Sequence, residues 1–259
     1  GIILKIFPYS NTSIICNVFT EDRGKLTFIA KGIRKPKNPL LSILQPFNLL
    51  EFNYYYKKNR AMHLIKEADI VFSFNHLRNN LSTILIGSTI LNIINRLFEE
   101  EYPQEIVFRL TYKTLNQLSS NMEHSKKLFL FFLFHLSKQL GFMPNINRCN
   151  SCNVLFEHDV IFSLSSNSLI CSNCNIHNSL DSDLVISYKS LSYLILINKT
   201  HINSIMDIKI SSLHLKELFH FLIIFMNSNI NYMHKIKGIK LDKKTKNALN
   251  LLKKSLHNI

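Results

Sequence analysis

Four cysteines arranged as two pairs carry the clearest chemistry in this sequence. Cys149 and Cys152 form one CxxC pair, and Cys171 and Cys174 form a second pair after eighteen intervening residues. Two such pairs at this spacing can present four thiolates to one Zn²⁺ ion. Because four sulfur ligands leave no open position for water or substrate, the spacing predicts a structural zinc ribbon or hairpin and not a catalytic metal.

Two disulfides or a redox pair are the alternative use of these cysteines, and the rest of the sequence argues against both. Cys16 is left over in an apolar run, where we expect a small core residue on a strand. A chain of 259 residues does not need disulfides to fold, and no charged and apolar leader precedes it, so we expect a reducing compartment. His158 and His177 lie near the pairs, but with four cysteines present we expect both outside the ligand set.

Short β-prone runs fill the first part of the chain, at 2–7, 13–20, 25–31, 47–55 and 61–71. A hairpin turn is expected at 21–24, which ends in Gly24. Five short strands in one small domain indicate an OB-like barrel, a fold whose face and loops commonly bind single-stranded nucleic acid. Most aromatics of such a barrel are core or rim, and any of them could instead stack a base. They are Tyr9, Phe28, Phe52, Tyr54, Tyr55 and Tyr56.

Helical periodicity replaces the β pattern from about residue 77. We expect helices over 81–97, after Pro103, over 125–140, over 213–226 and over 243–256, and a hairpin of 160–163 with 168–170 between the cysteine pairs. The predicted class is α+β, with an N-terminal OB-fold β-barrel followed by a helical domain that carries an inserted four-cysteine zinc-binding hairpin module. The predicted domains are 1–76 for the barrel, 77–148 with 175–259 for the helical domain, and 149–174 for the zinc module.

Charge is distributed unevenly along the chain, whose formal net charge is +14. Residues 1–76 hold eleven Lys and Arg against five Asp and Glu, a net charge of +6. Residues 77–230 are nearly neutral at +1, with twelve against eleven, and residues 231–259 reach +7, with eight against one. A generally lysine-rich composition would instead spread the positive charge evenly along the chain. Two basic regions around a neutral body therefore indicate phosphate-contacting surfaces, with a solvated lysine tail as the alternative for the last region.

Motifs of nucleotide-binding loops and of common hydrolytic enzymes are missing from the sequence. None of its six glycines lies in a GxGxxG, GxxxxGK or GxSxG pattern, and neither HExxH nor the zinc-deaminase signature occurs. The carboxylates of Glu99, Glu100 and Glu101 lie at an expected helix end, and the simplest interpretation is that they form a solvated face. The longest apolar stretch, 128–136, is too short to span a bilayer. We expect no enzyme and no membrane partner.

Several short segments, taken in order, resemble the RecO family of bacterial DNA repair and recombination mediators. They are YSNTS at 9–13, VFT at 18–20, Gly24, AKGIR at 30–34, LQPF at 44–47 and LGFMP at 140–144, just before the first CxxC. The resemblance covers nearly the whole chain and is strongest up to about residue 180. It implies an N-terminal OB-fold, a helical body and a zinc module.

The same resemblance implies a role without catalysis, in the bacterial cytoplasm at the nucleoid. Family members bind single- and double-stranded DNA, anneal complementary strands and act with RecR to load RecA onto DNA coated by single-stranded-DNA-binding protein. Asn38 and Pro39 depart from the family pattern, which often has Ser or Thr here, and the segment 237–240 lacks the Ser and Arg common near the end. The loop geometry and the C-terminal partner-binding surface therefore stay open.

Basic residues in the expected turn and loop of the barrel are the candidate DNA contacts. Cations there would neutralise phosphates while exposed aromatics stack bases without reading sequence. Annealing follows because screening two polyanions on adjacent surfaces lowers their repulsion. The alternative for each residue is a solvated basic loop. The candidates are Arg23, Lys25, Lys31, Arg34, Lys35 and Lys37.

Two other classes of protein compete with a DNA-annealing mediator. One is a zinc-ribbon assembly or transcription factor whose basic ends touch nucleic acid only incidentally. The other is a nucleic-acid enzyme, for which the glutamates at 99–101 are the densest cluster of carboxylates. Protein binding without annealing would select the first alternative, and metal-dependent nuclease activity that is lost on mutating those glutamates would select the second. An annealing assay on complementary oligonucleotides is the most useful single experiment.

Overall fold

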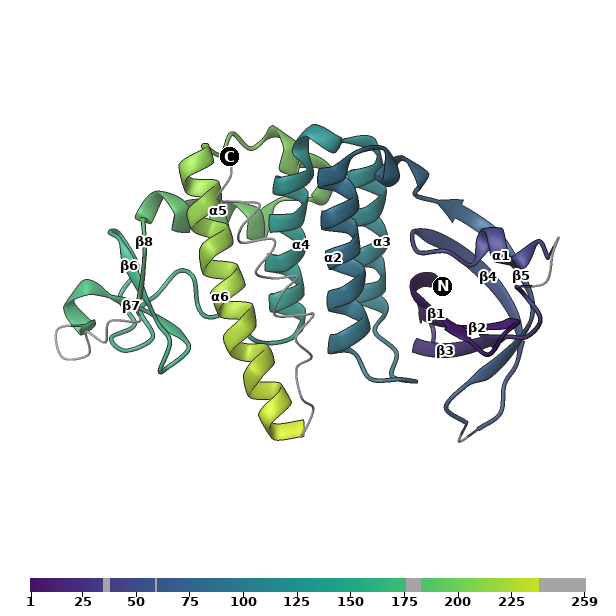
Figure 1. Ribbon diagram of the computed structural model, residues 1–259. Helices are drawn as coiled ribbons and strands as arrows, with labels where there is room; N and C mark the ends of the chain where they lie inside the picture. Colours follow the sequence, from purple (N-terminus) through teal and green to yellow (C-terminus); the bar gives the residue numbers. More distant parts are fainter. Residues whose placement is uncertain (35–37, 59, 176–182, 238–259) are drawn as a thin grey trace. The chain divides into compact units, whose positions relative to one another are not determined.

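The computed structural model describes residues 1–34, 38–58, 60–175 and 183–237 of the chain (Figure 1). By internal contacts the chain divides into two compact units, Gly1–Ser125 and Lys126–Ile259. This division groups the first two long helices with the barrel. It does not test the predicted boundaries after residues 76, 148 and 174, which stay predictions. No helix in the described part combines the length and the apolar character needed to cross a membrane.

A closed five-stranded barrel with strand order β1-β2-β3-β5-β4 forms the start of the first unit and confirms the predicted OB-like fold. The barrel core forms because side chains alternate between the inside and the outside along a strand. In β3, for example, Leu26, Phe28 and Ala30 are buried and the residues between them are partly exposed. Cys16 is fully buried in the same core, as expected. The strands are β1 (Ile2–Tyr9), β2 (Ser13–Thr20), β3 (Gly24–Ala30), β4 (Asn48–Tyr55) and β5 (His63–Ser73).

The β2–β3 hairpin turns where the sequence predicted, with Thr20 paired to Gly24. Gly24 has a φ of +70°, and a Cβ built there would lie 2.0 Å from the carbonyl oxygen of Tyr102. The segment before Tyr102 runs along the start of β3, since the Glu101 N–H donates to the Lys25 carbonyl at 2.9 Å. Glycine is therefore needed both for the turn and for this close approach.

Helices α2 (Leu81–Leu97) and α3 (Glu105–Ser120) complete the first unit. The side chain of Asn80 caps α2 by accepting a hydrogen bond from the Ser82 N–H at 2.8 Å. Gly87 allows α2 to pack on the barrel, because a Cβ there would lie 2.8 Å from the ring of Phe47. Short helical turns connect the longer elements. They are α1 (Leu40–Ile43), η1 (Asn75–Asn79) and η2 (Met122–His124).

The second unit consists of a three-stranded sheet, of order β7-β6-β8, and several helices. The hairpin of β6 (Val160–Ser163) and β7 (Ser168–Cys171) was predicted, and its Phe162 packs edge-on against Phe221 and Phe225 at 5.2 and 5.7 Å between ring centroids. These two rings belong to α6. The other elements are α4 (Ser125–Gln139), η3 (Ser172–Asn175), β8 (Leu184–Ile186), α5 (Tyr188–Lys199), η4 (Ile202–Asp207) and α6 (Ser212–Lys237).

Three features of this unit differ from the sequence-based expectation. The strand β8 and the helix α5 were not expected, and α6 continues past the predicted end at residue 226. β8 is three residues long and is held by pairing with β6, so it leaves little periodic signal of its own. The expected terminal helix at 243–256 lies outside the described residues.

Candidate metal centre and nucleic-acid interface

Two local folds bring the four predicted cysteines together. The first pair lies on a tight turn, in which the Cys149 N–H donates to the Val154 carbonyl and the Asn153 N–H donates to the Cys149 carbonyl, both at 2.9 Å. Asn153 adopts a φ of 60° to close this turn. The second pair begins at the end of β7 and continues into η3. A long-range hydrogen bond from the Asn150 N–H to the Leu169 carbonyl, at 3.0 Å, ties the first turn to β7.

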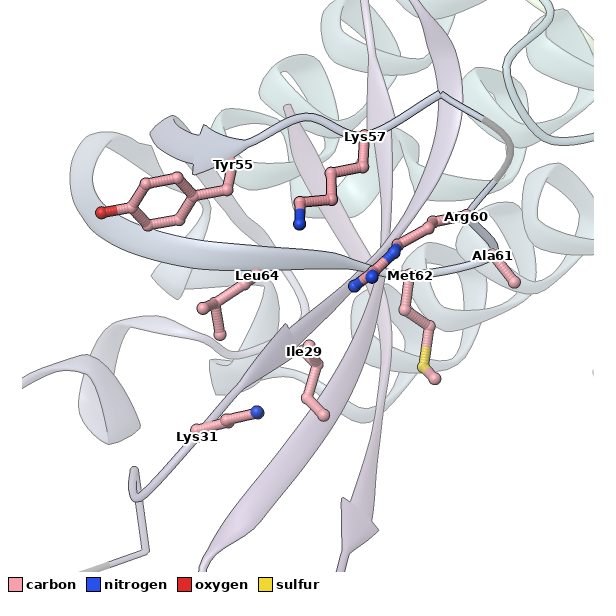
Figure 2. A pocket seen from close by; sticks show the side chains of 8 residues that line it. All are labelled: Ile29, Lys31, Tyr55, Lys57, Arg60, Ala61, Met62 and Leu64. Atoms are coloured by element: carbon pink, nitrogen blue, oxygen red, sulfur yellow. The ribbon is translucent and has the colours of Figure 1, made fainter.

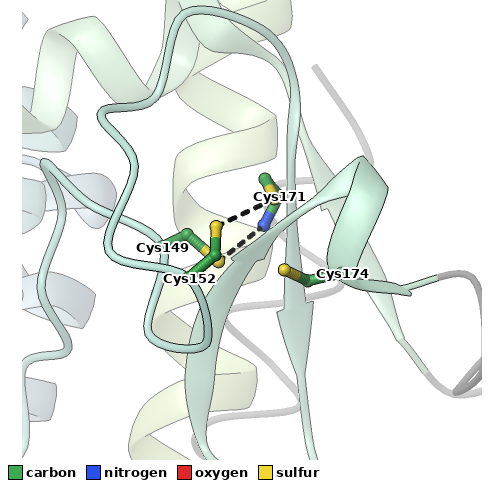
Figure 3. A group of neighbouring side chains, drawn as sticks. All are labelled: Cys149, Cys152, Cys171 and Cys174. Atoms are coloured by element: carbon green, nitrogen blue, oxygen red, sulfur yellow. Dashed lines mark hydrogen bonds between the residues drawn. The ribbon is translucent and has the colours of Figure 1, made fainter.

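The four sulfur atoms lie close enough to bind a single metal ion (Figure 3). All four Sγ atoms are within 4.8 Å of one another, and those of Cys152 and Cys171 are 3.7 Å apart. A tetrahedron with metal–sulfur bonds of about 2.3 Å has edges of about 3.8 Å, so this pair already has the required separation. The same separation is far longer than a disulfide bond of about 2.05 Å, and all four cysteines are free.

Hydrogen bonds within the cluster shift the pKa values of Cys149 and Cys174 in opposite directions. Burial raises the pKa of the Cys149 thiol, but backbone N–H groups of Cys152 and Cys171 pointing at its sulfur outweigh this and lower the pKa to about 6. The side-chain hydrogen bonds that Cys174 shares with Cys152 and Cys171 raise its pKa to about 12. One thiolate is therefore stabilised and further ionisation is resisted unless a cation balances the charge. An all-sulfur tetrahedral donor set fits Zn²⁺ or iron.

Of the two histidines near the pairs, the structure describes one. His158 is exposed and lies outside the group of four, as expected. His177 falls outside the described residues.

A row of paired residues crosses three strands on the outer face of the barrel. Tyr55 of β4 is opposite Leu64 of β5, and Leu64 is in turn opposite Ile29 of β3, where β3 and β5 run parallel. Three further residues lie just outside the ends of these strands and line the same hollow as the row. They are Lys31, Lys57 and Met62.

The same face is hollowed to a volume of about 550 Å³ (Figure 2). Ile29, Met62 and Leu64 provide apolar side chains, and Tyr55 borders them. Three cations also line the hollow, and Figure 2 shows the guanidinium of Arg60 reaching over the strands toward the middle of the group. These cations are Lys31, Lys57 and Arg60. The hollow thus combines apolar side chains, one exposed aromatic ring and three positively charged side chains.

Of the four predicted DNA contacts that the structure describes, Lys31 alone lines this hollow. Arg23 lies over the ring of Tyr56, with its guanidinium 4.8 Å from the centroid. Lys25 donates to the Asn95 carbonyl at 3.1 Å, and burial lowers its pKa despite the nearby glutamates. Arg34 is exposed on the loop after β3. The remaining two, Lys35 and Lys37, lie outside the described residues, and DNA contact by any of the six stays a prediction.

Strand alternation separates the tyrosines at 54–56 into different environments. Tyr54 packs edge-on against Phe28, at 4.8 Å between ring centroids, and Phe52 stacks on Phe28 at 5.0 Å. These three rings belong to or pack on the barrel core. Tyr55, in contrast, is 55% exposed, and Tyr9 is 46% exposed on β1. Tyr56 is 43% exposed, so exposure alone leaves these three tyrosines available to a base, and Tyr55 is the one that lines the hollow.

Tyr56 is held in a stack of its own. Its ring lies 5.0 Å from the ring of buried His63, on which it stacks, and its hydroxyl is 3.4 Å from Glu101. The other carboxylate oxygen of Glu101 is 3.2 Å from His63 Nε2. The neighbouring Glu100 accepts a hydrogen bond from the Thr27 hydroxyl at 2.6 Å. The acidic run is exposed, as expected of a solvated face, and Glu100 and Glu101 also form hydrogen bonds to the barrel region.

Lys57, Arg60 and Met62 were missed as candidate site residues by the sequence analysis. The run Tyr55–Arg60 contains two tyrosines and three cations, which is the mixture expected at a nucleic-acid surface. That signal was available from sequence. What was not available is the pairing of β5 with both β4 and β3, which places this run beside Lys31.

Comparisons with known proteins match nearly the full length of the chain. Residues 1–74 match the family model described as "Recombination protein O N terminal", and residues 78–235 match "Recombination protein O C terminal". The DNA repair protein RecO of Salinibacter ruber is 33% identical over 148 residues, which cover 57% of each chain. That of Prosthecochloris aestuarii is 31% identical over 149 residues, 58% of this chain and 56% of the relative. That of Caldicellulosiruptor saccharolyticus is 24% identical over 211 residues, 82% of this chain and 84% of the relative.

Proposed function

Because this chain belongs to the RecO family of DNA repair proteins, we propose that it is a recombination mediator that binds single- and double-stranded DNA and anneals complementary strands. In this proposal it acts with RecR to load RecA onto DNA coated by single-stranded-DNA-binding protein. It works without catalysis, in the bacterial cytoplasm at the nucleoid.

The observation that carries the proposal is the cation-bordered hollow on the barrel. Lys31, Lys57 and Arg60 line it, so the phosphates of a bound nucleotide meet positive charge. Its apolar side chains and the exposed ring of Tyr55 make no pattern of hydrogen-bond donors and acceptors that reads a base edge. Such a surface binds DNA through backbone and stacking and accepts any sequence.

Annealing is the consequence of that chemistry. Two DNA strands repel each other through their phosphates, and a cationic surface lowers the repulsion while raising the local strand concentration. A surface that reads no sequence leaves the choice of partner to base pairing. No step of this process breaks a covalent bond, so the protein needs no catalytic group.

We propose that the four cysteines hold one structural Zn²⁺ ion. The cluster uses only sulfur ligands and offers a closed tetrahedral shell, which supports a role in folding the β6–β7 module. Cys149, Cys152, Cys171 and Cys174 would be its ligands, and bound Zn²⁺ would supply structural cross-linking between the two turns.

The direct test is an annealing assay with complementary oligonucleotides, performed with metal-replete protein on naked strands and on strands coated with single-stranded-DNA-binding protein. We expect faster annealing of both. Tight protein binding with no annealing would favour a zinc-ribbon assembly or transcription factor. Metal-dependent cleavage that disappears on replacing Glu99, Glu100 and Glu101 with Gln would favour an enzyme instead.

Recruitment by the coating protein needs a separate test, because annealing of naked DNA does not require it. We propose that apolar surface of the helical body binds the acidic, hydrophobic tail of single-stranded-DNA-binding protein. A synthetic tail peptide should bind with an affinity that falls as salt rises, and excess peptide should inhibit annealing of coated strands more than that of naked strands. Equal inhibition would mean that the peptide competes for the DNA site.

A further inference from the structure

We propose that the hollow bordered by Tyr55 is a single-nucleotide subsite. It binds one unpaired base of single-stranded DNA against its apolar side chains. Duplex DNA, in contrast, contacts only the cations of the hollow, from outside. This inference rests on the proposed function and assigns the part of the surface that distinguishes the two forms of DNA.

The first support is the position of the apolar residues. Ile29 and Leu64 are neighbours across β3 and β5, and both are only partly exposed between the cations. A volume of about 550 Å³ lies inside the range of about 300–1,000 Å³ typical of small-molecule sites. In a duplex the bases are stacked and paired, so none can enter such a hollow without being extruded. An unpaired base carries no such cost.

The second support is the availability of Tyr55 compared with its neighbours. Tyr54 is packed on Phe28, and the Tyr56 ring stacks on His63 and contacts the Arg23 guanidinium. A base that displaced either ring would break these contacts. Tyr55 is 55% exposed and keeps a free face at the hollow, so stacking a base on it breaks no packing that the described residues show.

The third support is the arrangement of charge around the ring. Lys57 lies two residues after Tyr55, Lys31 directly follows the end of β3, and both line the hollow. A nucleotide has a phosphate on each side of its sugar, and both can therefore meet a cation while the base is inside. Duplex phosphates can reach the same cations from outside the hollow. Both forms of DNA then depend on Lys57 and Arg60, but only single strands depend on Tyr55.

The experiment compares Tyr55→Ala with Tyr55→Phe and with Tyr188→Ala, a matched control on an exposed tyrosine of α5 outside the hollow. Fluorescence anisotropy is measured with a single strand of about 16 nucleotides, the upper length covered by one OB fold, and with its duplex. Tyr55→Ala should weaken single-strand binding about 5- to 150-fold, the effect of losing one base stack, and should change duplex binding less than about twofold. Tyr55→Phe should restore single-strand binding.

A second measurement reports stacking directly and does not depend on any variant being folded. Strands containing 2-aminopurine should lose fluorescence on binding the wild-type protein, because stacking on an aromatic ring quenches this base. Strands containing 5-iodouracil should crosslink to Tyr55, as mapped by mass spectrometry. Crosslinking to Tyr9 or to neither tyrosine would contradict the subsite.

The outcomes separate this inference from the proposed function. If the wild-type protein binds neither form of DNA, the proposed function is wrong. If it binds both and Tyr55→Ala weakens both equally, or weakens neither, the protein is a DNA-binding protein without this subsite. Replacing Lys57 and Arg60 with Gln should weaken binding of both forms and reduce the slope of log affinity against log salt by up to about two, one for each lost phosphate contact.

Discussion

The side-chain amides of Asn167 and Asn229 hydrogen-bond to each other in both directions, with N–O distances of 2.8 and 3.1 Å. Asn167 lies at the tip of the β6–β7 hairpin with a φ of 51°, and Asn229 is buried on α6. Asn229 also donates to the Phe225 carbonyl at 2.8 Å. This pair therefore fastens the hairpin that precedes the second cysteine pair to the longest helix of its unit.

Breaking the amide pair should destabilise the second unit from either side. Asn167→Gly keeps the backbone conformation of the turn but leaves the buried Asn229 amide short of a partner, so we expect the free energy of unfolding to fall by about 1–3 kcal/mol. Urea unfolding measures the effect. In a double-mutant cycle with Asn229→Ala, the combined loss should be smaller than the sum of the single losses. Additive losses would show that the two amides do not act together.

The four-cysteine cluster was predictable from sequence because its signal is local. Two residues separate the cysteines within each pair, and the hairpin of β6 and β7 between the pairs has its own turn and strand signals. Chain connectivity alone therefore brings Cys149 and Cys171 near each other. The burial of Cys16 followed likewise from the apolar run around it.

The hollow was not predictable in the same way, because its residues come from three strands. A register irregularity between Asn53 and Tyr54 decides which tyrosine of the run faces outward. Parallel pairing of Ile29 with Leu64 then adds the end of β3 to the site. Neither feature has a signal in the residue pattern, so the sequence analysis weighed Tyr54, Tyr55 and Tyr56 equally.

Metal analysis should find close to one zinc ion per chain in protein purified without added metal. Because the binding free energy of a structural site contributes to folding, Cys149→Ser should lower the melting temperature more than it lowers the DNA affinity of the protein that remains folded. Cys16→Ser is the control, since this thiol is buried in the barrel and should leave the zinc content unchanged. A disulfide between Cys149 and Cys152 under reducing conditions would contradict the prediction.

Glu217 should make the second unit sensitive to acid. Burial raises the pKa of its carboxyl, but hydrogen bonds from the Ser187 N–H and the hydroxyls of Ser187 and Ser190 outweigh this and lower the pKa. A carboxylate with a folded-state pKa below its unfolded value, about 4.3, stabilises the fold above that value. The stabilisation disappears as pH falls through the folded-state pKa.

Glu217→Gln should therefore lower the melting temperature at pH 7 and flatten its decline in acid. Melting curves from about pH 7 to pH 3 in both proteins give the comparison. Glu123→Gln, a variant of an exposed glutamate, is the control and should follow the wild-type profile. Parallel profiles for Glu217→Gln and the wild type would show that this carboxylate does not govern the acid response.

Gly24→Ala should destabilise the barrel unit strongly, because two separate penalties act at this position. The φ of +70° is unfavourable for any residue with a Cβ, and the new Cβ would also meet the Tyr102 carbonyl at 2.0 Å. Gly141→Ala is the matched comparison, since Gly141 has a φ of +73° with no atom within 4 Å of the built Cβ. Gly141→Ala should cost about 1–2 kcal/mol from backbone strain alone, and Gly24→Ala distinctly more. Urea unfolding followed by hydrogen exchange in each unit measures both, and equal costs would mean that the 99–102 segment moves away from β3 without penalty.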